Sequence, residues 1–172
     1  MRFAFRALGG ALLFALALLP AAARAHKPSD STLALRAEGN ELVGQWDIAV
    51  RDLDLALGLD ADADARITWG ELRAQRTNLF AYALSRLALS AGGTRCPSAA
   101  RELRVDRHSD GAYAVLDFRA DCAAKPRAIE VEYSLLFELD AQHRGLLRLD
   151  GESGVQTAIF ASDARARRFE LG

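Results

Sequence analysis

Apolar and polar residues alternate along most of the chain after residue 30, which is the pattern of half-buried β-strands. Residues 31–37 (STLALRA) place Leu33 and Leu35 on one face, and the Gly-Asn pair after them is typical of a hairpin turn. A second run, LVGQWDIAV, covers residues 42–50. Turn signals separate the other candidate strands, which are 101–105, 112–118, 128–139, 146–149 and 155–160. Short strands at this spacing predict a mainly β fold, specifically a β-sandwich.

One segment has helical spacing instead. Residues 51–59 (RDLDLALGL) place leucines four apart, and the early aspartates suit the positive end of a helix dipole. Residues 69–87 (WGELRAQRTNLFAYALSRL) carry apolar side chains near helical spacing, and Thr68 can cap that helix. The pattern predicts a helix-loop-helix insertion at about 51–87 within a single β-rich domain that covers 26–172.

The sequence DADADARITWGE lies between these two helices. Its first, third and fifth positions are aspartates and its twelfth is a glutamate, which is the spacing of an EF-hand calcium loop. Alternate positions turn their carboxylates toward one centre, and Ca²⁺ takes six to eight oxygens in proteins. Position seven contributes only its backbone carbonyl, and position nine acts through a water molecule. The predicted calcium ligands are Asp60, Asp62, Asp64, the carbonyl of Arg66, Thr68 and Glu71.

Position six of this loop departs from the pattern, because Ala65 stands where glycine is usual. A side chain in the left-handed conformation costs about 1–2 kcal/mol, which is roughly a tenfold loss of affinity. Calcium sites in extracellular modules work at about 10⁻⁴–10⁻³ M, so the loss leaves a working site. The alternative is a solvated acidic turn that keeps the loop shape without the ion. A single loop of this kind inside a β domain favours a structural role for the ion over a sensory one. Mg²⁺ fits less well than Ca²⁺, because it prefers few protein ligands and more water.

The first 25 residues (MRFAFRALGGALLFALALLPAAARA) have the charged, apolar and small-residue order of a secretory signal peptide, with cleavage after Ala25. The apolar run over residues 7–19 is shorter than the roughly 20 residues needed to span a bilayer, and no later segment is apolar enough to cross one. A periplasmic or secreted location is therefore expected. In such a compartment Cys96 and Cys122 predict one disulfide, with free buried thiols as the alternative.

Charge and motifs exclude several functions. The signal segment holds three of the 22 Lys and Arg residues and none of the 23 Asp and Glu residues, so the remainder is net acidic by four charges and suits no nucleic-acid partner. The sequence has no nucleophile elbow, no HExxH and no Gly-rich phosphate loop, so we expect no enzyme activity.

A second metal site is suggested by the histidines. Cleavage after Ala25 makes His26 the first residue, so its α-amine and imidazole can chelate Cu²⁺ or Ni²⁺ together. His143 is the candidate second ligand, whereas His108 is expected to be solvated in a turn. The alternative is that His26 is only the residue after the cleavage site and His143 a surface or capping residue.

Three segments resemble a known bacterial family. They are AHKPSDSTLAL (25–35), GQWDIAVRDLDLALGLDADADARITWGEL (44–72) and HRGLLRLDGESGVQTAIFASDARARRFEL (143–171). Together they are similar to the extracytoplasmic N-terminal region of HupE/UreJ-like membrane proteins. The resemblance implies a β-rich exported domain, a link to nickel or cobalt handling and a membrane protein as partner. The sequence as a whole predicts an exported calcium-binding structural or interaction domain. A periplasmic copper- or nickel-binding protein that uses His26 is the alternative.

Overall fold

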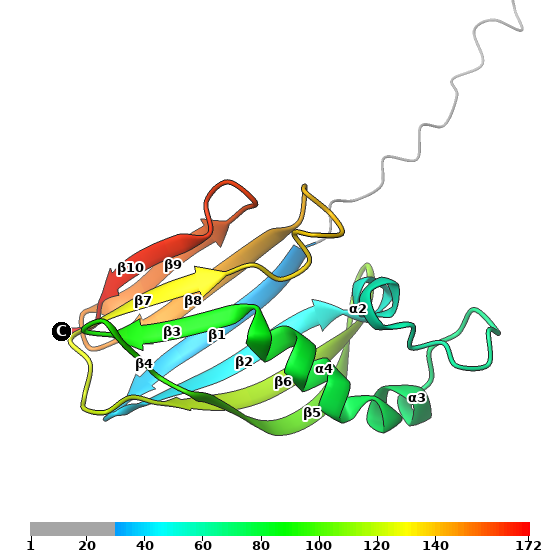
Figure 1. Cartoon of the computed structure of the whole chain (residues 1–172), viewed down its shortest axis with the longest axis horizontal. Coiled ribbons are helices and arrows are strands. Elements are labelled where there is room, and N and C mark those ends of the chain that lie inside the picture. Colours follow the sequence, from blue (N-terminus) through cyan, green and yellow to red (C-terminus); the bar gives the residue numbers. More distant parts are fainter. Residues whose placement is uncertain (1–29) are drawn as a thin grey trace, which may run out of the picture.

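Two β-sheets packed face to face form the body of the protein (Figure 1), so the predicted β-sandwich is confirmed. The computed structural model describes residues 30–172, and the predicted signal peptide lies outside them. The larger sheet has the order β5-β6-β2-β1-β8-β9. Its strands are β1 Asp30–Glu38, β2 Glu41–Ala49, β5 Ser98–His108, β6 Gly111–Asp121, β8 Arg144–Gly151 and β9 Gly154–Phe160. The smaller sheet has the order β10-β7-β3-β4. Its strands are β3 Leu87–Ala91, β4 Thr94–Arg95, β7 Ala128–Tyr133 and β10 Ala166–Glu170.

Strand β1 is central to the larger sheet. It pairs antiparallel with β2, where Leu33 lies opposite Trp46, and parallel with β8, where Leu33 lies opposite Leu147. The period of two along each strand places these three side chains on the face that meets the smaller sheet. All three are buried. The core thus joins segments from opposite ends of the chain.

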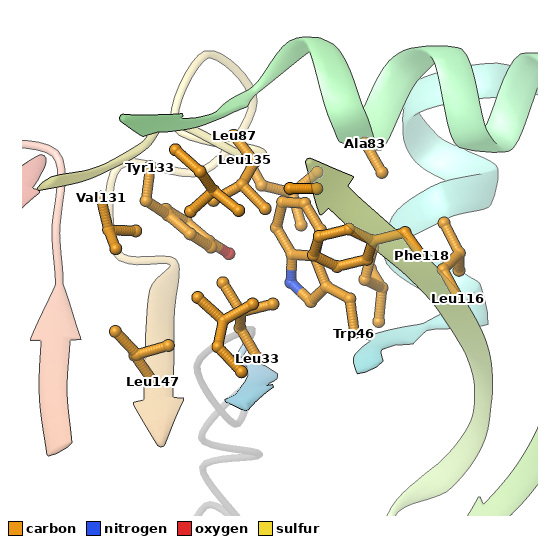
Figure 2. Packing of buried hydrophobic residues seen from close by; sticks show 14 of the residues in the cluster. Leu33, Trp46, Ala83, Leu87, Leu116, Phe118, Val131, Tyr133, Leu135 and Leu147 are labelled. Atoms are coloured by element: carbon orange, nitrogen blue, oxygen red, sulfur yellow. The ribbon is translucent and has the colours of Figure 1, made fainter. Parts of the chain in front are cut away.

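Aromatic side chains fill the space between the sheets (Figure 2). Trp46 and Tyr133 are each at most 1% exposed, and their ring centroids lie 5.4 Å apart. Tyr133 also stacks on Phe160 at 5.4 Å. Gly145 makes this packing possible, because a Cβ built there would lie 2.5 Å from the Tyr133 ring. The position therefore requires the absence of a side chain rather than an unusual backbone angle.

A hydrogen-bonded cluster within this core joins the two sheets. The Tyr133 hydroxyl on β7 lies 2.5 Å from Ser31 Oγ on β1 and 2.8 Å from His143 Nε2. Trp46 Nε1 donates to the same serine oxygen at 3.3 Å. Burial lowers the pKa of the His143 imidazole, because the charged form would lose its hydration. Arg144 lowers that pKa further, while the carboxylates of the nearby Asp52, Asp140 and Asp30 raise it.

Three helices lie between β2 and β3, where the insertion was predicted. They are α2 Val50–Leu57, α3 Trp69–Ala74 and α4 Arg76–Ser85. The single helix predicted over 69–87 is therefore wrong, because the backbone at Gln75 (φ −91°, ψ 7°) leaves the helical range and separates α3 from α4. Leu87 already belongs to β3. The strand predicted over 128–139 ends at Tyr133, and a turn follows in which Leu136 has a φ of 61°.

The predicted disulfide between Cys96 and Cys122 is confirmed, with an S–S distance of 2.00 Å. It ties the segment after β4 to the end of β6, and it is consistent with an extracytoplasmic, oxidising compartment. Within residues 30–172, no helix has the length and apolar character needed to cross a membrane.

Candidate metal centre

The acidic loop begins where α2 is closed by a left-handed glycine. Gly58 has a φ of 63°, and its N–H donates to the Asp54 carbonyl at 2.7 Å. The Asp54 side chain then receives the N–H groups of Leu59 and Asp60, at 2.7 and 3.1 Å. Leu59 is 1% exposed and so fixes this end of the loop to the core. The sequence pattern places Asp54 among the early aspartates of this helix, but it lies in the last turn, where a carboxylate before a glycine can accept these N–H groups.

The loop ends in a capping box at the start of α3. The Glu71 N–H donates to Thr68 Oγ1 at 3.3 Å, and the Thr68 N–H donates back to Glu71 Oε2 at 2.7 Å. Ile67 and Leu72, on either side of the cap, pack against the core. Both ends of the loop are therefore held, while residues between them project from the end of the sandwich (Figure 1).

Three of the four predicted carboxylates come together across this loop. Asp60, Asp62 and Glu71 each place one oxygen so that all three atoms lie within 4.8 Å of one another. Like charges at such a separation repel, and a cation between them would remove that repulsion. An all-oxygen donor set suits hard cations such as Ca²⁺, whereas copper and nickel prefer nitrogen ligands.

Backbone N–H groups turn the loop around the aspartates. Asp60 accepts from the N–H of Asp64 at 3.1 Å and from that of Ala65 at 2.8 Å. Ala65 has a φ of 63°, so the sharp turn predicted at position six is confirmed. Ala63 also has a positive φ, of 59°, which the spacing of the aspartates does not predict. The loop therefore contains two alanines in a conformation that favours glycine.

The remaining predicted ligands are arranged differently. Asp64 Oδ1 accepts from the N–H of Arg66 at 2.8 Å and lies outside the group of three oxygens. The Thr68 hydroxyl donates to Glu71 Oε2 at 2.8 Å. The roles of Asp64, the Arg66 carbonyl and Thr68 as calcium ligands stay predictions. Hydrogen bonds from the Thr68 N–H and hydroxyl, and from the Ala61 N–H, hold the pKa of Glu71 below its usual range.

The predicted histidine site is not assembled within the described residues. His143 is 0% exposed and bonds to Tyr133, so it is not the surface residue that was the alternative expectation. His26 lies outside the described residues, and its chelation of Cu²⁺ or Ni²⁺ stays a prediction. His108 has a partly exposed side chain that stacks on Tyr113 with ring centroids 4.2 Å apart.

Comparison with known proteins does not assign the chain to a family. No protein-family model matches the chain, and no curated protein matches it significantly.

Proposed function

We propose that the protein is an exported domain that binds one Ca²⁺ ion in the loop 60–71. The observation that carries the proposal is the convergence of Asp60 and Asp62, from the start of the loop, with Glu71 from its end. Both ends of the loop are anchored, and the Ala61 N–H donates to Glu71 Oε1 at 2.9 Å, so these carboxylates are held close together. A single ion between them would hold the loop closed.

Calcium fits this site better than other cations. Ca²⁺ accepts six to eight oxygens in flexible geometry, and a bidentate glutamate at the last position is characteristic of its loops. Asp64, the Arg66 carbonyl and a water held by Thr68 would supply the remaining oxygens. Mg²⁺ demands a smaller octahedral shell and keeps several waters.

The proposed role of the ion is structural. An ion that binds only the folded state adds RT ln(1 + [L]/Kd) to its stability, which is about 2.7 kcal/mol at a hundredfold excess over Kd. The loop joins α2 to α3, whose buried side chains Leu53 and Leu72 cover one end of the sandwich. Calcium would therefore stabilise the packing of the insertion against the sheets.

The disulfide and the signal-like first 25 residues support a periplasmic or secreted location. The proposal includes the assignment to the extracytoplasmic regions of HupE/UreJ-like proteins, which rests on the three resembling segments. Under this assignment a membrane protein is the expected partner.

Calorimetric titration and thermal melting of the chain from His26 onward test the proposal. Millimolar Ca²⁺ should bind with a one-to-one ratio and raise the melting temperature, and Mg²⁺ at the same concentration should do much less. Glu71→Gln removes a charge and the bidentate carboxylate, yet its amide oxygen can still accept from Thr68, so the helix cap survives. We expect this variant to lose most of the calcium response.

Glu132→Gln is the matched control, because Glu132 is an exposed glutamate on β7, away from the loop. It should respond to calcium as the wild type does. If the wild type and both variants melt alike with and without calcium, the loop is a solvated acidic turn and the proposal fails.

A further inference from the structure

A partly apolar groove of about 510 Å³ lies between the exit of the acidic loop and strand β5. We call it the β5 groove. Ile67 and Trp69 form one wall, and Val105 with Arg107 forms the other. Leu72 and Leu103, which are 2% and 7% exposed, lie beneath them.

The apolar walls of the β5 groove are open to solvent. Trp69 is 48% exposed and Val105 is 42% exposed, although both are large apolar side chains. Together they offer apolar area that a bound side chain would cover. Burial of such area contributes about 25 cal/mol per Å².

Strand β5 also presents its backbone to this groove. It is an edge strand, paired with β6 on one side only. The N–H of Arg107 donates to the Asp106 side chain at 2.7 Å, so this amide points away from β6. Because the pairing alternates along an antiparallel strand, the amides of Val105 and Leu103 point to the same outer edge.

Other parts of this edge are protected. The Arg101 carbonyl accepts from Arg76 Nη2 at 2.6 Å, and the register of β5 shifts between Ala100 and Glu102. Both features are ways in which proteins block an edge strand against further pairing. The accessible part of the β5 edge is therefore the part that borders the groove.

The charge at the groove favours an acidic partner. Arg107 lies on the same face of β5 as Leu103 and Val105, whereas Glu102 and Arg104 alternate onto the opposite face. Arg104 is bonded to Asp117 at 2.8 Å. Within residues 30–172, no ion pair engages the guanidinium of Arg107.

We propose that the β5 groove binds an extended, acidic peptide segment of a partner protein. The segment adds to the outer edge of β5 as a further strand. One of its apolar side chains fits between Trp69 and Val105, and a neighbouring acidic side chain pairs with Arg107. The proposal does not depend on calcium binding, because the strand edge, Val105 and Arg107 belong to β5, although Ile67 and Trp69 of the other wall belong to the loop 60–71.

Selection of a phage-displayed library of random twelve-residue peptides on the chain from His26 onward tests this. Enriched peptides should alternate apolar residues with Asp or Glu. Synthetic copies should shift the emission of exposed Trp69 to the blue, above the constant background of buried Trp46. Their Kd should rise at least tenfold for Val105→Lys.

Val155→Lys is the matched control, because Val155 is 54% exposed and lies on β9, the opposite edge strand of the same sheet. It should leave the Kd within twofold. Arg107→Glu should likewise weaken the acidic peptides, whereas Arg167→Glu, on β10 of the other sheet, should not. If Val105→Lys melts at a lower temperature, the Arg107→Glu comparison decides.

The proposal is overturned if no peptide is enriched, or if the enriched peptides prefer Lys or Arg. It is also overturned if they bind Val105→Lys or Arg107→Glu as tightly as the wild type.

Discussion

Replacing Ala65 by glycine should stabilise the calcium-bound protein. Ala65 has a φ of 63°, and a side chain in this left-handed conformation costs about 1–2 kcal/mol. Glycine removes that cost, but it also gives the unfolded chain more freedom, which offsets about 0.4–1 kcal/mol. The net gain is about 1 kcal/mol. For a domain of this size it corresponds to a rise of about 2–4 °C in melting temperature.

The gain can appear in the stability of the calcium-free protein or in the calcium affinity, depending on the conformation of the loop without calcium. If the loop keeps the left-handed turn without the ion, Ala65→Gly raises the melting temperature in EDTA and leaves the calcium Kd unchanged. If the turn forms only around the ion, the melting temperature in EDTA does not rise and the affinity increases about fivefold, since 1.4 kcal/mol is a factor of ten. The free energy of unfolding at saturating calcium rises in both cases.

Urea unfolding at saturating calcium and in EDTA measures both parts of the effect. Ala61→Gly is the control, because Ala61 lies in the same loop and does not have a positive φ. That variant should lose about 0.4–1 kcal/mol, because glycine gives the unfolded chain more freedom. A loss of stability in Ala65→Gly equal to that of Ala61→Gly, at saturating calcium, would refute the argument from backbone strain.

Two further predictions concern the core. Because burial lowers the pKa of His143, its imidazole stays neutral to a lower pH in the folded protein than in the unfolded chain, which takes up a proton below about pH 6.5. The contribution of His143 to the free energy of unfolding is present above that pH and is lost as the pH falls. Urea unfolding between pH 7.5 and 5.5 should therefore show a steeper fall in this free energy for the wild type than for His143→Gln. His108→Gln is the control and should behave as the wild type does. Gly145→Ala should lower the free energy of unfolding by about 1–3 kcal/mol, because its Cβ would lie 2.5 Å from the Tyr133 ring. Gly70→Ala, where the nearest atom is 3.6 Å away, should melt at or above the wild-type temperature, and equal melting of the two variants would contradict this packing argument.

The sequence was most informative where local chemistry decides the structure. The alternation of Leu33 and Leu35 predicted β1, and the spacing of the aspartates predicted the turn at Ala65. The two cysteines predicted the disulfide. Each of these signals lies within a few residues or depends on a single pairing.

Features that depend on distant partners could not be predicted. Strand β10 (ARRFE) buries one residue, Phe169, so it shows no alternation. The apolar residues of β3 continue directly from those of α4, so the pattern predicts one continuous helix as far as Leu87. The turning of Asp64 toward the N–H of Arg66 depends on the loop backbone, which the spacing of carboxylates alone does not specify.

The position of β1 has a consequence for the order in which the protein can fold. This strand lies near the N-terminus, but one of its two neighbours is β8, which lies near the C-terminus. Strand β1 cannot pair with its second neighbour until β8, which ends at Gly151, is available, and such non-local pairing makes folding slow. A chain that crosses a membrane N-terminus first would therefore stay open during its passage. It would assemble only when most of its length had reached the far side.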